Sequence, residues 1–105
     1  MTSQYETSTG FTTLFTQQLG TSSNDSGDSV AVDSSNNIYV TGTSGGGLDN
    51  NTNSGYSDII LVKYNSSGTK QWTQQLGTAS NEFSLGVDVD SSDNIYVTGQ
   101  TAGGL

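Results

Sequence analysis

The sequence is dominated by one internal repeat. The segment Thr16–Thr21 (TQQLGT) recurs as Thr73–Thr78, 57 residues later. The same shift relates Asn37–Gly42 (NIYVTG) to Asn94–Gly99. From residue 15 to residue 48 the copies align without a gap, and about two thirds of the pairs are identical. A period of this size indicates structural units that stack on one another.

One unit of the repeat predicts four β-strands, which we name A to D in chain order. Polar turns at Ser34–Asn37 and Asn65–Gly68 separate runs that are rich in β-branched and aromatic residues. Asn36, its counterpart Asp93, and Gly68 stand where the turns favour positive φ. No stretch has helical periodicity, so strands and period together predict the four-stranded blades of a β-propeller. The predicted strands are Val30–Asp33, Ile38–Thr41, Asp58–Tyr64 and Lys70–Leu76.

The strands before and after this unit predict two half-blades. Ser3–Thr7 and Phe11–Leu19 stand in the places of strands C and D, with a diverged turn at Ser8–Gly10. Residues 1–27 then form half of a shared blade, residues 28–77 a complete blade, and residues 78–105 strands A and B of another shared blade. Within one chain the two halves cannot meet, so we expect a second copy to complete each shared blade. Two blades per chain, and four to eight blades in a propeller, predict a homotrimer or homotetramer ring with six or eight blades.

Three segments carry a resemblance to a known family. Residues 87–99 (VDVDSSDNIYVTG), 57–68 (SDIILVKYNSSG) and 72–77 (WTQQLG) resemble the SBBP repeat, named after a seven-bladed β-propeller. The A-turn-B rhythm is also similar to an NHL-type blade. The resemblance covers about residues 11–105 and implies an architecture without a particular reaction. The strand count departs from the family name, because a symmetric ring of two-blade chains has an even number of blades.

Composition excludes several partners. Ten acidic residues against two lysines give a net charge of −8, which disfavours nucleic acid and anionic membrane surfaces. The chain has no cysteine or histidine, so we expect no thiolate metal site and no cofactor. We expect no signal peptide at Met1, although the abundance of Ser, Thr, Asn and Gly is typical of extracellular and cell-surface repeat proteins. Hydrophobic residues make up 30% of the chain, which is little for a self-sufficient core.

The loops predict one binding face. Alternating strand directions place the loops 20–29, 77–86 and 43–57 at the same end of the blades, opposite the tight turns. Three types of residue make this face a candidate ligand-binding site: a repeated amide, a repeated carboxylate and one aromatic ring. The carboxylates could form a polar or cation-binding ring, or bond to their own loop backbone. The aromatic ring could stack on a ligand or pack between blades. The candidates are Asn24, Asp25, Asn81, Glu82 and Phe83.

Other residues favour structural roles. Asp88, Asp90 and Asp93 have a calcium-loop-like spacing but lack the glycine and distal glutamate of an EF-hand, which favours a turn-forming role. Alternation within strands predicts that the larger aromatic side chains lie in the core. These are Phe15, Tyr39, Trp72 and Tyr96.

No sequence motif supports catalysis. A nucleophile elbow and a phosphate-binding lysine loop are both missing. Two functions remain: a self-assembling propeller scaffold, from duplication or engineering, or a module that binds glycans or proteins at the long-loop face.

Overall fold

The structure is a computed structural model that describes residues 2–7 and 10–105, with side chains from residue 13 onward. It has a strand at each of the eight predicted places, and the described residues contain no helix. No helical segment that could cross a membrane is found in this described part. The predicted turn at Ser8–Gly10 lies partly outside the described residues. The strands are β1 (Thr2–Thr7), β2 (Gly10–Thr16), β3 (Asp25–Val32), β4 (Ile38–Ser44), β5 (Asp58–Tyr64), β6 (Lys70–Leu76), β7 (Glu82–Val89) and β8 (Ile95–Thr101).

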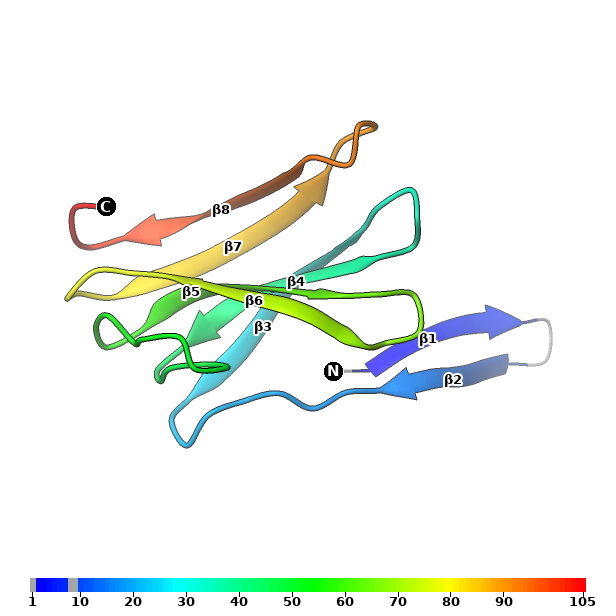
Figure 1. Cartoon of the computed structure of the whole chain (residues 1–105), viewed down its shortest axis with the longest axis horizontal. Helices are drawn as coiled ribbons and strands as arrows, with labels where there is room; N and C mark the ends of the chain where they lie inside the picture. Colours follow the sequence, from blue (N-terminus) through cyan, green and yellow to red (C-terminus); the bar gives the residue numbers. More distant parts are fainter. Residues whose placement is uncertain (1, 8–9) are drawn as a thin grey trace.

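The strands form one complete blade and two strand pairs. β3, β4, β5 and β6 make a four-stranded antiparallel meander, with β1–β2 and β7–β8 as separate two-stranded sheets. Figure 1 shows β7–β8 alongside the meander, while the β1–β2 hairpin projects beyond it. The contacts of β7 are with β3, β4 and β5, so one face of the pair stacks on the complete blade. This stacking is the interface between consecutive blades within the chain.

The tight turns have the predicted backbone geometry. Asn36 and Asp93 have φ of 64° and 63°, and Gly68 has φ of 84°. Asp33 fixes the first turn, because Oδ1 accepts hydrogen bonds of 2.9 Å from the backbone N–H groups of Ser35 and Asn37. A Cβ at Gly68 would also lie 2.5 Å from the ring of Phe15, so this turn requires glycine for two reasons.

The first strand of each blade is longer than predicted. β3 begins at Asp25 and not at Val30, and β7 begins at Glu82, so the predicted loops 20–29 and 77–86 are too long. A bulge between Gly27 and Ser29 lets this polar segment continue the ladder with β4, and β7 has the same irregularity. Likewise, β4 extends to Ser44, so the B–C loop starts two residues later than predicted.

The two faces of the complete blade carry different side chains. Leu48, Ile60, Val62 and Tyr64 form a buried cluster on one face, next to a cavity of about 250 Å³. On the other face Tyr39 is buried, 6.2 Å from Trp72 between ring centroids.

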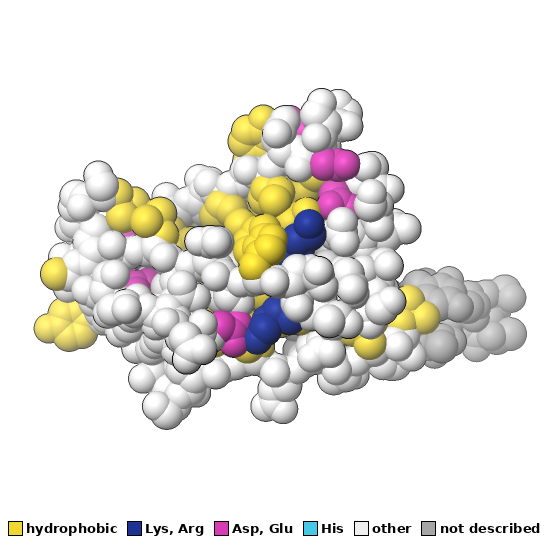
Figure 2. Space-filling model, in the orientation of Figure 1, with side chains coloured by type: hydrophobic (Ala, Val, Ile, Leu, Met, Phe, Trp, Pro, Cys, Tyr) yellow, Lys and Arg dark blue, Asp and Glu magenta, His cyan; other side chains and the backbone are white. Residues whose placement is uncertain are grey.

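The prediction of an aromatic core is wrong for one of its four members. Tyr96 is 58% exposed, because strands C and D of its own blade are not present beside it. Figure 2 shows hydrophobic side chains gathered in the hollow between the complete blade and the β7–β8 pair.

Candidate binding face

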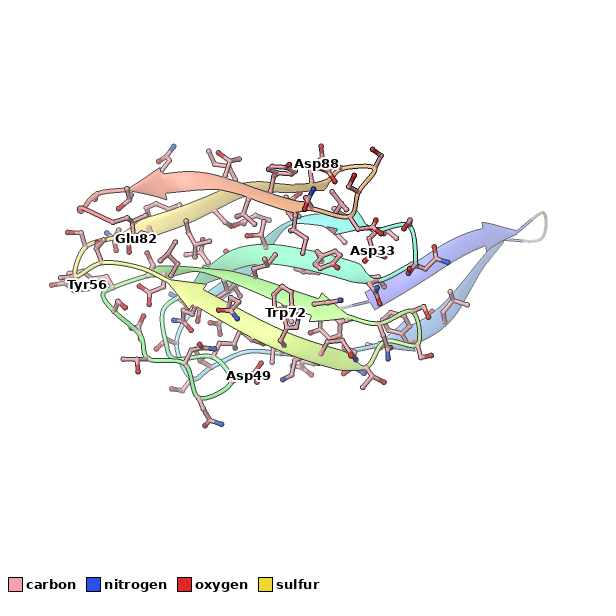
Figure 3. The ribbon with its side chains drawn as sticks, turned by 45° about the horizontal axis from the view of Figure 1, so that its top comes forward. Asp33, Asp49, Tyr56, Trp72, Glu82 and Asp88 are labelled. Atoms are coloured by element: carbon pink, nitrogen blue, oxygen red, sulfur yellow. The ribbon has the colours of Figure 1, made fainter. Side chains whose placement is uncertain are left out.

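The loops between blades and the long B–C loop meet at one end of the molecule. The N–H of Gly45 donates a hydrogen bond of 2.7 Å to the carbonyl of Asn24, and the N–H of Glu82 donates one of 3.0 Å to the carbonyl of Ser57. Figure 3 shows Tyr56 and Glu82 at this end, and Asp33 at the opposite end with the tight turns. The long-loop face therefore exists as a continuous surface on this side.

Asp25 is engaged in its own loop. Its carboxylate accepts hydrogen bonds from the N–H of Thr21 at 2.7 Å and from the hydroxyls of Thr21 and Ser44. Partial burial raises the pKa of Asp25, but the hydrogen bonds from Ser44 and Thr21 outweigh it and hold the pKa below the ordinary value of 3.8. The carboxylate therefore closes the entry to β3 as an acceptor for the loop.

Glu82 has the same role in the second copy and is completely buried. Its carboxylate accepts hydrogen bonds from the hydroxyl of Thr78, from the N–H of Thr78 at 3.0 Å, and from Thr101 Oγ1 at 3.0 Å. The Thr78 hydroxyl is the main cause that lowers the pKa of Glu82, against the opposing effect of burial. Because this carboxylate is inaccessible, direct contact with a ligand would require the loop to move.

A second buried carboxylate lies opposite Glu82. Asp58 is fully buried, and its Oδ2 accepts hydrogen bonds from Ser54 N at 2.7 Å and Gln75 Nε2 at 3.1 Å. Its Oδ1 receives no hydrogen bond from any residue that the structure describes. A Cβ added at Gly77 would overlap this Oδ1 and lie 3.0 Å from Oε2 of Glu82, so both carboxylates face this glycine. The sequence did not indicate Asp58, because residue 1 takes its place in the first copy.

The remaining candidates lie at the surface. Asn24 and Asn81 are exposed, and the side chain of Asn81 accepts a hydrogen bond of 3.3 Å from the Ser57 hydroxyl. Phe83 is 49% exposed on the opposite face of β7 from the buried Glu82. Tyr56, which sequence reasoning missed, is 81% exposed in the neighbouring loop. A ligand reaching this end would meet amide and aromatic groups before any carboxylate.

The carboxylates with calcium-like spacing form a turn and an inter-repeat contact. Asp90 accepts hydrogen bonds of 2.9 Å from the N–H groups of Ser92 and Asn94. Asp93 instead accepts a hydrogen bond of 3.0 Å from the N–H of Ser34 in the first copy. The described residues contain no cluster of three metal-ligating side chains.

Comparison with known proteins agrees with this architecture. The SBBP beta-propeller repeat family matches residues 14–49 and 71–105, which is more than half of the chain. The chain is also 29% identical, over 114 aligned residues, to an uncharacterised WD repeat-containing protein of Acanthamoeba polyphaga mimivirus. That match covers 88% of this chain and 8% of the viral protein. The chain therefore spans a small part of this relative.

These blades are β-propeller blades, and the chain belongs to the SBBP beta-propeller repeat family.

Proposed function

We propose that this chain is a self-assembling propeller scaffold without intrinsic catalysis, in which copies associate head to tail into a closed ring of three or four. The β7–β8 pair of one copy joins the β1–β2 hairpin of the next to make a complete blade. The proposal concerns the 105-residue chain, and it extends the propeller architecture by naming what covers its open surfaces.

Unequal burial of equivalent residues is the observation that carries this proposal. Tyr39 is 3% exposed, whereas Tyr96, the same residue in the second copy, is 58% exposed. Leu48 and Leu105 differ in the same way, at 2% and 67%. Both exposed residues lack the C and D strands that cover their equivalents, so a neighbour that supplies these strands would bury them.

The preceding side of the complete blade is open as well. Val30 and Val32 on β3 are 61% and 55% exposed, whereas Val87 and Val89 on β7 are partly buried against the complete blade. The outer side of β8 is also without a paired strand among the described residues. Exposed apolar faces and free strand edges favour association, and a ring removes both at every copy.

Light scattering on the parent chain tests the proposal. A closed ring has a mass of about 33 kDa for three copies or 44 kDa for four, from 10.9 kDa each. Deletion of residues 1–19 removes β1 and β2, and with them the strands that complete the neighbour's blade, so the truncated chain should not close. A matched control is Tyr56→Asp, which changes an 81% exposed residue outside the proposed interface and should leave the mass unchanged. A folded 11 kDa parent, or a truncated chain that still closes, would contradict the proposal.

A second candidate function is supported by the long-loop face. Asn81, Phe83 and Tyr56 are exposed there, and a ring would repeat them around its axis, which favours binding of glycans or proteins through avidity. A glycan array probed with the assembled ring tests it. Binding that is lost on Tyr56→Ala would support this function, and an array without binding would leave the scaffold alone.

A further inference from the structure

The interface between consecutive blades within the chain has a polar centre. The hydroxyl of Ser84 on β7 donates a hydrogen bond to Oδ2 of Asp28 on β3. The N–H of Ser84 donates one of 3.2 Å to Oγ1 of Thr43, whose hydroxyl lies 3.5 Å from the same Asp28 oxygen. Ser84 is buried at 5% exposure. A carboxylate at the bulge of one blade thus bonds to a hydroxyl on the first strand of the next.

The repeat predicts which residues occupy these places between copies. A shift of 57 residues carries Asp28 onto Leu85, and it carries Gly27 onto Ser84. Leu85 also occupies the bulge of its strand, as Asp28 does, and it is 57% exposed. If the two kinds of interface share one geometry, Leu85 of one copy faces Gly27 of the next. The polar pair within a chain is therefore replaced by an apolar pair between chains.

The surroundings of Gly27 suit a leucine. Gly27 borders the cavity of about 250 Å³, which is lined mainly by apolar side chains. This cavity is larger than the roughly 150 Å³ that accommodates benzene in an apolar core. A Cβ at Gly27 would lie 4.0 Å from Cγ1 of Val40, so the glycine opens directly onto the cavity. Its apolar lining consists of Leu19, Val40, Leu48, Ile60, Val62 and Tyr64.

We propose that Leu85 of one copy inserts into the cavity beside Gly27 of the next copy, and that this contact holds neighbouring copies together. The inference rests on the proposed ring, and it identifies the side chain and the cavity that join the copies. Phe83, on the same outward face of β7, packs beside the inserted leucine. The occupant is a second copy because the chain already stacks one blade on the next through the equivalent positions.

Two single variants and their combination test the contact. Burial of a leucine side chain strengthens association about ten- to a hundredfold, so Leu85→Asp should raise the concentration at half-assembly by at least about tenfold. Gly27→Ser places a hydroxyl in the apolar cavity and should also weaken assembly. The double variant rebuilds the carboxylate–hydroxyl pair that Asp28 and Ser84 make within the chain. It should therefore assemble more tightly than Leu85→Asp alone. Tyr56→Asp is the control for adding an aspartate.

Disulfide formation gives a second readout that does not depend on a destabilising change. The chain contains no cysteine, so Leu85→Cys combined with Gly27→Cys should form covalent dimers and larger species under mild oxidation. Exclusively monomeric bands from an assembled sample would overturn the inference. So would a Leu85→Asp variant that assembles like the parent, or a double variant no better than that single one. In these cases the ring stands and only this contact fails, whereas a monomeric parent would remove both.

Discussion

Truncation of the same tyrosine in each copy should have unequal effects in the isolated chain and similar effects in the ring. Tyr39 is 3% exposed, packs against Trp72, and donates a hydrogen bond of 2.9 Å to Asp33. Loss of a large buried aromatic side chain costs about 3–5 kcal/mol, so Tyr39→Ala should lower the free energy of unfolding by this amount. Tyr96 is 58% exposed and makes mainly the equivalent 3.0 Å hydrogen bond to Asp90. Tyr96→Ala should cost the isolated chain about 1 kcal/mol.

Assembly should close this gap of about 2–4 kcal/mol, because a neighbour's strands would then cover Tyr96. The assay is urea unfolding of both variants and the parent at two protein concentrations, one below and one above assembly. Each variant is compared with the parent at the same concentration, since association itself raises apparent stability. At the higher concentration the cost of Tyr96→Ala should approach that of Tyr39→Ala. A gap that stays constant while the parent's mass increases would refute the reasoning.

Three further perturbations test individual features. Trp72→Ala should cost about 2 kcal/mol in thermal or urea unfolding, because this half-buried ring covers Tyr39 in the blade, and a parent-like melting curve would exclude that role. Burial raises the pKa of Asp33, but hydrogen bonds from Asn37 and Tyr39 lower it to about 2 from 3.8. Its contribution is therefore complete above about pH 4 and lost as the pH falls through 2, and Asp33→Asn should flatten acid unfolding in this window. Calcium at low millimolar concentration should leave the melting temperature unchanged, because both carboxylate oxygens of Asp90 already accept hydrogen bonds within its turn. A large increase that Asp90→Asn abolishes would contradict this.

The sequence predicted the strands and turns where local chemistry determines them. β5 combines a β-branched and apolar run with a Gly-containing turn, and its observed bounds, Asp58–Tyr64, are those predicted. Asn36 and Asp93 were expected to have positive φ because their side chains tolerate it, and they do. The repeat then extended these local predictions to the second copy.

Features that depend on neighbouring blades were less predictable. Residues 25–29 read as a loop because they are polar and do not alternate, yet they continue β3. Their ladder partners lie on β4, and one of their faces awaits another blade, so no local signal indicates the strand. The burial of Glu82 was equally invisible, since Asp25, its equivalent in the first copy, is exposed. Composition could not distinguish these environments, because they differ only in what stacks on them.

The places where the two copies diverge agree with this dependence on neighbours. Residues 25–29 all differ from residues 82–86, and residues 43–45 all differ from residues 100–102. Most of these positions pair with one another across β3–β4 and β7–β8, so much of the divergence lies in one patch of each blade. Within that patch the changes are matched. Asp25 accepts a hydrogen bond from Ser44, and in the second copy the longer Glu82 accepts one from Thr101. Duplication alone leaves identical copies, whereas compensated pairs preserve the fold of each blade while altering its contact surface. The patch that diverged includes the bulge that faces the next blade, where different side chains allow each surface to recognise a different partner.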